Sequence, residues 1–449
     1  MNVGLPKGTR DFGPEELFKR RYIFNTIQKY FELYGYSPIE TPSMENLSTL
    51  LGKYGDEGDQ LLFKVLNNGD YLKKVPGDIL ADKDSTKATK HLAKRGLRYD
   101  LTIPFARYAV MHRNDINLPF KRYQIQPVWR ADRPQKGRYQ EFFQCDADVI
   151  GADSLQYEAE CVLLFDQVFA ELGLRVDIRI NNRKLLSALC QKINAFDQLS
   201  SITTAIDKLD KVGFEGVQNI LEKEGLSHDQ INTIEQYLNA EHLQEIADMF
   251  QHEEEGQQGI SEINQVYTFL DGKTLQNKLT FDPTLARGLS YYTGAILEVR
   301  SSEAEMGSIG GGGRYDNLTA LFGGEKLGGM GISFGAERIY DIMEELHLLD
   351  KAQMEAPVLI LTLDEKYHAY GFDILQQLRA KGIRSDLYPS GAKMKKQMKY
   401  ANRINARYIM ILGPEEWENK EIAIKNMITG KQYNVNIDDA VDIILEKTE

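Results

Sequence analysis

Charged and aromatic side chains alternate along a stretch that ends at Asp148 and could bind a charged substrate. Four of them share one parity of a predicted strand: Arg138, Phe142, Gln144 and Asp148. Arg130 ends the predicted strand before it. Because burying unpaired charge is costly, this face is not an ordinary core layer. It is either a solvated sheet face or a pocket floor, where arginines bind phosphate or carboxylate and the ring stacks on a flat group.

Two other segments carry polar side chains that could belong to the same pocket. Arg98, Asp100 and Thr102 share one parity of a predicted short strand, and a half-exposed strand is the alternative. In LARGLSYYTG, Arg287 precedes a glycine that permits close approach of the backbone. If this segment is a strand, its two tyrosines point to opposite faces, and a turn with one of them in the core is the alternative: Tyr291 and Tyr292.

Two glycine-rich segments complete the candidate residues. Four successive glycines in SIGGGGRYDNL, residues 308–318, weaken a strand and suit either a ligand that comes close or a flexible hairpin loop. Their spacing does not match a phosphate-binding P-loop. In LGGMGISFGAERI, residues 327–339, a glycine-rich strand leads into a helix with Arg338 in its first turn. A guanidinium there could stack on a flat ligand, and a surface arginine is the alternative.

The hydrophobic pattern predicts the elements that must position these residues. Apolar residues at helical spacing predict a helix over 14–34, followed by an extended stretch over 36–42. Alternation with a period of two predicts two antiparallel strands joined by a loop at 132–137. Helices over 152–172 and 336–348 are expected beside them.

The chain is expected to be a multidomain α/β protein. We predict a discontinuous main domain at 1–180 and 275–348, interrupted by a mainly helical insertion at 181–274. An exposed linker at 349–356 should lead to a separate domain at 357–449, where PVLILTL opens a β-α-β-α-β rhythm.

Composition limits the possible classes of function. The chain has 449 residues, of which 42% are hydrophobic, enough for more than one core. We expect no secretory leader, no membrane span and no structural zinc, and the three scattered cysteines suit a reducing cytoplasm. The net charge is −12, but residues 390–407 carry six basic residues and no acidic one. This segment, and a second basic one at 87–98, could bind nucleic acid or be solvated helix faces.

Taken together, these segments resemble the histidyl-tRNA synthetase family of class II synthetases. The helix and strand ending at Pro42 resemble motif 1, WRADRPQKGRYQEFFQCDAD resembles motif 2, and GISFGAERI resembles motif 3. LARGLSYYTG and GGGRYDNL resemble the two histidine-specific segments. The resemblance implies an antiparallel-sheet catalytic domain flanked by helices, a helical insertion and a C-terminal α/β anticodon-binding domain.

The resemblance also implies roles for individual residues. Those expected to bind ATP are Arg130, Asp132, Arg138, Phe142 and Arg338. Those expected to bind histidine are Asp100, Thr102, Arg130, Gln144, Asp148, Arg287, Tyr291 and Tyr292. Arg130 and Arg287 are the expected catalytic residues. Contacts with tRNA are expected from Arg133, Gln135, Lys393, Lys395, Lys396 and Lys399. Asp100 and Asp148 replace glutamates of the common bacterial pattern, so the chain resembles the eukaryote-type branch. Asp132 stands where the common motif 2 pattern has a glutamate, which puts its contact with adenine in doubt.

The implied reaction is the ATP-dependent activation of L-histidine and its transfer to tRNA(His). The implied assembly is a cytoplasmic homodimer formed through motif 1, which uses Mg²⁺ bound with ATP and no prosthetic group. Two alternatives keep the fold: an inactive regulatory subunit of ATP phosphoribosyltransferase, and a class IIa synthetase for another amino acid. A pure tRNA-binding or kinase-regulatory module would not need both an adenine clamp and an amino-acid pocket.

Overall fold

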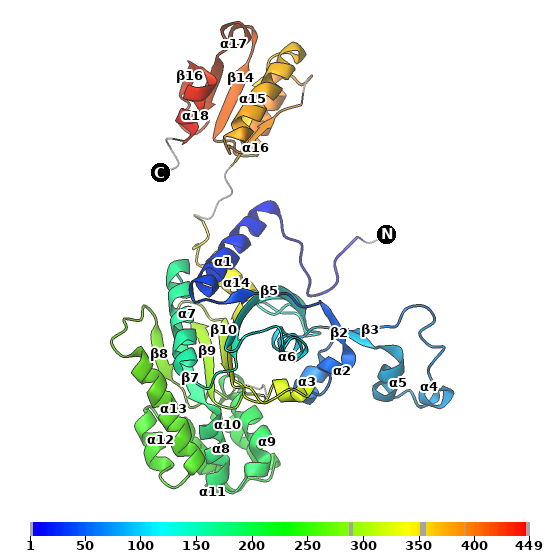
Figure 1. The fold of residues 1–449 in the computed structure, drawn as a ribbon, viewed down its shortest axis with the longest axis vertical. Helices are drawn as coiled ribbons and strands as arrows, with labels where there is room; N and C mark the ends of the chain where they lie inside the picture. The colour runs from blue at the N-terminus through cyan, green and yellow to red at the C-terminus, as the bar shows by residue number, and fades with distance from the viewer. Residues whose placement is uncertain (1–2, 287–290, 351–355, 390, 446–449) are drawn as a thin grey trace. The chain divides into compact units, whose positions relative to one another are not determined.

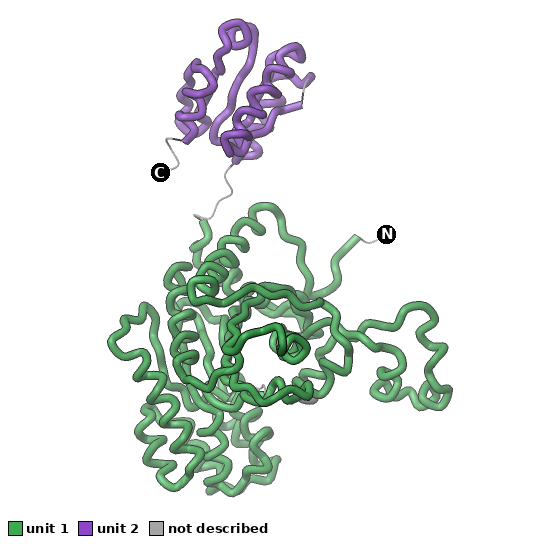
Figure 2. The backbone as a smooth tube through the Cα atoms, in the orientation of Figure 1, with its two compact units in different colours: residues 1–352 green, residues 353–449 purple. Residues whose placement is uncertain are grey.

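A computed structural model describes the chain at residues 3–286, 291–350, 356–389 and 391–445. It divides into two compact units, Met1–Ala352 and Gln353–Glu449, which Figure 2 colours separately. Each unit has apolar cores of its own. Leu349, expected to open an exposed linker, is instead fully buried in the main core of the first unit.

An eight-stranded sheet forms the centre of the first unit, in the order β1-β5-β6-β11-β10-β9-β7-β8 (Figure 1). Its inner strands pair antiparallel, whereas the edge strands β1 and β8 run parallel to their neighbours. The bounds are β1 Ser37–Pro38, β5 Phe120–Trp129, β6 Glu141–Ile150, β7 Val176–Asn182, β8 Lys278–Phe281, β9 Ala295–Ser301, β10 Gly310–Arg314 and β11 Gly329–Gly335. The predicted antiparallel hairpin is therefore confirmed as β5 and β6.

One face of this sheet is apolar and packs against helices. Because successive side chains of a strand point to opposite faces, Cys145 and Ala147 of β6 lie in the core, while Gln144, Asp146 and Asp148 face the other way. Three of the helices that share this core are α1 Pro14–Leu33, α7 Gln156–Leu172 and α14 Ala336–Glu345 (Figure 1). The opposite face is left for polar residues.

These helices were predicted with small errors at their ends. Helix α1 begins at Pro14 as expected, and Gly35 takes a φ of +79°, which lets the chain leave the helix. Helix α7 begins at Gln156 rather than 152 and ends before Gly173, whose φ is +72°. Helix α14 ends at Glu345, three residues before the predicted end.

The predicted strand through Arg98, Asp100 and Thr102 is wrong. The strand β4 covers only Arg95–Leu97, and it pairs with β2 Met44–Asn46 and β3 Lys64–Val65 in a small antiparallel sheet. Arg98 is buried and donates hydrogen bonds to the backbone carbonyls of Thr41 and Pro127, while Thr102 begins the helix α6 Thr102–Met111. The short helices around this sheet are α2 Leu47–Leu50, α3 Gly55–Gln60, α4 Gly77–Asp82 and α5 Ser85–Leu92.

The segment expected as an insertion is helical, as predicted. It leaves the main sheet after β7 and returns at β8, and its helices enclose a second apolar core. They are α8 Arg183–Lys192, α9 Leu199–Ile206, α10 Leu209–Lys223, α11 His228–Leu238, α12 Leu243–Met249 and α13 Glu254–Leu270.

The second unit is a five-stranded sheet in the order β13-β12-β14-β15-β16, with helices beside it. The predicted β-α-β-α-β series is confirmed as β12 Val358–Thr362, α15 His368–Ala380, β13 Ser385–Leu387, α16 Met394–Arg403 and β14 Tyr408–Leu412. The elements that were not predicted are α17 Pro414–Asn419, β15 Ile422–Asn426, β16 Gln432–Val435 and α18 Ile437–Leu445. Across both units, none of the helices described is long and apolar enough to cross a membrane.

Candidate functional site

The polar face of the hairpin continues onto the glycine-rich strands. Two rows of directly opposed residues cross the sheet: Arg122, Asp148, Gly331 and Gly313 in one, and Gln124, Asp146, Ser333 and Gly311 in the next. Opposed residues of antiparallel strands lie on the same face. The face predicted from the hairpin alone is therefore wider, because β11 and β10 extend it.

Asp148 is held from two sides. The hydroxyl of Tyr315 donates a hydrogen bond of 2.5 Å to Oδ1, and Nη2 of Arg122 lies 2.7 Å from Oδ2. Burial raises the pKa of the Asp148 carboxyl, while Arg122 and the Tyr315 hydrogen bond lower it. A Cβ atom on Gly331 would lie only 2.0 Å from Oδ1 of Asp148. A glycine is thus needed at position 331 to leave room for the Asp148 side chain.

The two tyrosines of LARGLSYYTG do not point to opposite faces. The centroids of the Tyr291 and Tyr292 rings lie 4.8 Å apart at 58°, because the chain turns here instead of forming a strand. A Cβ atom on Gly313 would lie 2.7 Å from the Tyr292 ring. Burial raises the pKa of Tyr291, whereas its hydrogen bond with the side chain of Thr102 lowers it. Thr102 therefore reaches the site from the first turn of α6.

Asp100 is buried close to these tyrosines. Its Oδ1 accepts hydrogen bonds from the hydroxyl of Tyr54 at 2.9 Å and from the backbone N–H of Ile103 at 3.2 Å. Burial raises the pKa of its carboxyl, and these hydrogen bonds and Arg130 lower it. Asp148 raises it further, so the two carboxylates are close enough to influence each other.

Gln144 and Arg130 lie further along the same face. Nε2 of Gln144 donates to Oγ of Ser333 at 3.2 Å, and its buried Oε1 has no hydrogen-bond partner within the described part of the chain. The Arg130 guanidinium lies over the rings of Tyr99, 4.1 Å from its centroid, and of Phe142, at 5.2 Å. Its Nε donates to the backbone carbonyl of Tyr99.

Arg138 reaches the site from a different position than predicted. It lies in the loop before β6, where its Nη1 is 3.5 Å from Oδ1 of Asp132. Arg338, at the start of α14, donates to the carbonyls of Gly137 at 2.8 Å and Ser308 at 2.6 Å. Burial lowers the pKa of Arg338, and so do the nearby charges of Arg138 and Arg130. The three guanidinium groups form one cationic cluster. The expected catalytic residue Arg287 lies outside the described residues.

Several residues at this site were missed from the sequence as candidates. Tyr54 and Ser333 hold Asp100 and Gln144, and Tyr315 holds Asp148. Arg122 had the parity of the polar face, which was the available signal, but its partner is set by the register between β5 and β6. Asp146 lies between Gln144 and Asp148, and burial raises the pKa of its carboxyl to about 7.

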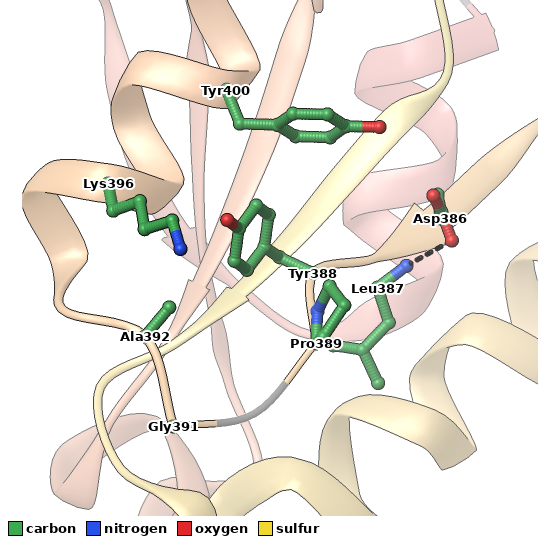
Figure 3. Close-up of a pocket in the computed structure, with 8 residues that line it drawn as sticks. All are labelled: Asp386, Leu387, Tyr388, Pro389, Gly391, Ala392, Lys396 and Tyr400. Atoms are coloured by element: carbon green, nitrogen blue, oxygen red, sulfur yellow. Dashed lines mark hydrogen bonds between the residues drawn. The ribbon is translucent and has the colours of Figure 1, made fainter.

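The second unit carries the basic residues predicted to contact tRNA. Lys393, Lys395, Lys396 and Lys399 are exposed at the start of α16 and along it. Beside this helix lies a hollow of about 580 Å³, lined by Tyr388, Tyr400, Lys396 and Asp386 among others (Figure 3). The rings of Tyr388 and Tyr400 meet edge to face, with centroids 5.2 Å apart.

The other basic segments differ from one another. Arg133 and Gln135 are exposed in the hairpin loop, as a contact with nucleic acid requires. In the segment 87–98, by contrast, Lys87 lies near Asp82 and Asp84, and Arg98 is buried. This segment is therefore less cationic at its surface than its sequence suggested.

Among the described residues, the cysteines and possible metal ligands add no further site. Cys145, Cys161 and Cys190 are buried free thiols, and burial raises their pKa values. In the part of the chain that the structure describes, no group of three or more histidine, cysteine or acidic side chains could hold a metal ion.

A mainly antiparallel sheet with an arginine-bearing hairpin, in a chain that also has a separate α/β unit, defines a class II aminoacyl-tRNA synthetase. Residues 83–339 match the family model described as histidyl-tRNA synthetase, and residues 357–447 match an anticodon binding domain. The chain therefore belongs to the histidyl-tRNA synthetase family.

Individual relatives agree over the full length. A histidine–tRNA ligase of Christiangramia forsetii is 52% identical and covers 96% of this chain and 97% of its own. One from Porphyromonas gingivalis is 50% identical and covers 97% of each. The crystal structure of histidyl-tRNA synthetase from Nostoc sp. PCC 7120 covers 100% of both chains, at 28% identity and a TM-score of 0.81. These relatives are bacterial, and the resemblance to the eukaryote-type branch stays a prediction.

Proposed function

We propose that this chain is a histidine–tRNA ligase whose reaction takes place on the polar face of the β5–β6 hairpin. It activates L-histidine with ATP to histidyl-adenylate and pyrophosphate, and then transfers histidine to tRNA(His). The observation that carries the assignment of the site is the meeting of Asp100, Asp148 and the Tyr291–Tyr292 pair on one face, next to the arginine cluster.

Histidine binds at the acidic end of this face. Asp100, Thr102 and Gln144 hold the substrate ammonium group, and Oε1 of Gln144, which has no hydrogen-bond partner among the residues that the structure describes, is a free acceptor for it. Asp148 and Tyr292 hydrogen-bond the imidazole ring, and Tyr291 packs against Tyr292. A buried acceptor of this kind rejects ligands without the matching donor, because such a ligand would leave it unpaired.

ATP binds at the basic end. Activation brings the histidine carboxylate to the α-phosphate, and negative charge grows in the transition state. Arg130 stabilises this charge together with Arg287, and Arg138 holds the outer phosphates. Adenine stacks between Phe142 and Arg338, with Asp132 beside it. ATP would bring Mg²⁺ with it, and the ion would offset part of the negative charge on the phosphates beside these arginines.

The tRNA binds through both units. The exposed lysines of α16 attract the phosphate backbone, and the hollow beside this helix is lined by the rings of Tyr388 and Tyr400, on which an unstacked base can lie (Figure 3). Arg133 and Gln135, in the hairpin loop, contact the acceptor end. The acidic total charge disfavours non-specific polyanions.

The chain acts as a homodimer in the cytoplasm. Helix α1, in the motif 1 region, leaves four large apolar side chains exposed, which a second copy could cover: Leu17, Phe18, Tyr22 and Leu33. The three free thiols suit a reducing compartment, where tRNA is charged. Light scattering on the purified chain should give twice the monomer mass, and a monomer at assay concentrations would contradict the dimer.

Histidine-dependent exchange between ATP and pyrophosphate tests the function as a whole. The chain should exchange the label with histidine and should fail with proline, threonine or glycine. Exchange without any of these amino acids, or none with histidine, would contradict the proposal. Charging of tRNA(His) with labelled histidine then tests the second step.

A further inference from the structure

Arg122 is an unusual residue, because its side chain is fully buried and yet incompletely paired. Its exposed fraction is 0%, and neither Nε nor Nη1 has a hydrogen-bond partner within the described residues. A buried guanidinium with two unpaired nitrogens costs stability. Its presence therefore calls for a role other than stabilising the fold.

The contacts that Arg122 does make join two parts of the histidine site. Its Nη2 lies 2.7 Å from Oδ2 of Asp148 and donates to the carbonyl of Leu101 at 3.5 Å. Leu101 stands between Asp100 and Thr102, the residues assigned to the substrate ammonium group. The guanidinium also lies over the ring of Phe105, 4.2 Å from its centroid, which fixes it against α6.

The orientation of Asp148 depends on this contact. Tyr315 takes one lone pair of Oδ1, and Arg122 faces Oδ2, so each oxygen keeps a further acceptor position. Because Gly331 has no side chain, Asp148 can lie flat over β11 in this orientation. A carboxylate fixed in this way is ready to accept a hydrogen bond from an imidazole N–H without rearranging first.

We propose that Arg122 is a positioning residue for histidine recognition, which keeps Asp148 ionised and oriented and links it to the segment that binds the substrate ammonium group. The proposal rests on the assignment of Asp148 to the imidazole. Arg122 itself does not contact the substrate. It acts through Asp148 and through the backbone at Leu101.

Charge supports this role. The carboxylates Asp100, Asp146 and Asp148 are buried close together, because Asp148 raises the pKa of both others and Asp100 also raises that of Asp146. Arg122 lowers the pKa of both Asp146 and Asp148, which burial raises. Other titratable groups coupled to Asp148 are Tyr36, Asp100, Asp146, Cys161 and Tyr315. None of these is a cation at neutral pH, so loss of Arg122 would leave Asp148 prone to protonation.

Substitution of Arg122 tests the proposal through the balance of kinetic constants. In the exchange assay, Arg122→Met should raise the KM for histidine by about tenfold or more, and the KM for ATP by no more than about twofold. The variant-to-unmodified ratio of the histidine KM should fall as the pH rises from 7 to 9, because the protonated Asp148 is then ionised again. The substrate histidine titrates equally in both assays, so the ratio cancels the effect of its titration on KM.

Matched variants separate positioning from folding. Lys121→Met removes the neighbouring cation of β5, which pairs with Glu160, and should leave both KM values unchanged. Arg122→Lys keeps the charge but cannot reach both Leu101 and Asp148. Its histidine KM should therefore lie between those of the unmodified chain and Arg122→Met, and its ratio to the unmodified value should not change with pH. If Arg122→Met does not fold, this lysine variant decides.

Three results would overturn the proposal. They are an unchanged histidine KM in folded Arg122→Met or in Arg122→Lys, an equal rise in both KM values, and a pH ratio that stays flat in folded Arg122→Met. Absence of histidine-dependent exchange in the unmodified chain would instead contradict the proposed function, whatever the Arg122 variants do.

Discussion

The sheet face of the first unit and helix α16 of the second are both rich in cations, but they hold them differently. On the sheet face, Arg122 is buried beside Asp148, and Arg338 donates to two backbone carbonyls. On α16, by contrast, the side chains of Lys395, Lys396 and Lys399 are exposed. The buried arginines therefore point their N–H groups in fixed directions, whereas the exposed lysines provide positive charge without fixed hydrogen-bond geometry.

This difference matches the two kinds of ligand. A small amino acid and a nucleotide are distinguished by hydrogen bonds of fixed geometry, which buried arginine forks provide. A tRNA backbone presents many equivalent phosphates, for which mobile ammonium groups are sufficient. Substitutions on the sheet face should therefore change activation, and those on α16 should change only the use of tRNA.

The largest effect is expected at the arginine cluster. Arg130→Ala should lower kcat for histidine-dependent exchange by about 10²–10³-fold, as loss of a transition-state donor does. Arg287→Ala should give a similar loss. Arg113→Ala, which removes an exposed arginine that is not one of the three in the cluster, is the control. Near-normal exchange in Arg130→Ala would remove it from the catalytic residues.

A smaller but specific effect is expected at Gly331. In Gly331→Ala the new methyl group would meet Oδ1 of Asp148, so the carboxylate must turn away. The KM for histidine should rise by about tenfold, with a loss of about 1–3 kcal/mol in the free energy of unfolding from overpacking. Gly77→Ala is the control, since nothing lies within 4 Å of its added Cβ. An unchanged histidine KM would show that the orientation of Asp148 is unimportant.

On α16, charge reversal should affect a different step. Lys395→Glu with Lys396→Glu should raise the KM for tRNA about tenfold and reduce the salt dependence of tRNA binding, while exchange without tRNA stays normal. Lys420→Glu with Lys431→Glu makes the same change in net charge elsewhere on the second unit. An equal loss of tRNA charging and of exchange without tRNA would point to misfolding, and would contradict the separate roles of the two regions.

The smallest effect concerns stability and pH. Burial raises the pKa of Asp146 to about 7 in the folded state, against about 3.9 when unfolded. Between these values the folded chain holds a proton that the unfolded chain has released, so this group's contribution to stability falls as the pH rises.

Asp146→Asn lacks this proton. Its melting temperature relative to the unmodified chain should therefore rise by a few degrees between pH 5 and pH 8. The exposed Asp248→Asn should give a constant difference. A constant difference for Asp146→Asn too would mean that the carboxyl is already ionised at pH 5.

Sequence periodicity predicted the features that depend on local pattern. The hairpin was found because a sheet with one polar face alternates with a period of two, and α1 because its apolar residues recur along one side. The strand through Arg98 was wrong because the same alternation arises where a buried arginine bonds to distant carbonyls. Parity alone does not distinguish the two cases.

Contacts between distant segments could not be predicted in this way. The four glycines of β10 looked like room for a ligand, but Gly313 makes room for Tyr292, and Gly331 of the neighbouring strand for Asp148. The pairing of Arg122 with Asp148 follows from the register of two strands, which alternation alone leaves open. The glycines therefore belong to the site as much as the charged residues do.

Because β7 and β8 pair in parallel, the helices between them also have a topological role. Adjacent parallel strands cannot be joined by a tight turn, because the chain must first travel back along the sheet. The helices α8 to α13 serve as that return path, since β7 ends at Asn182 and β8 begins at Lys278. A shortened chain without them would still need a crossover of a dozen or more residues to keep β8 at the sheet edge.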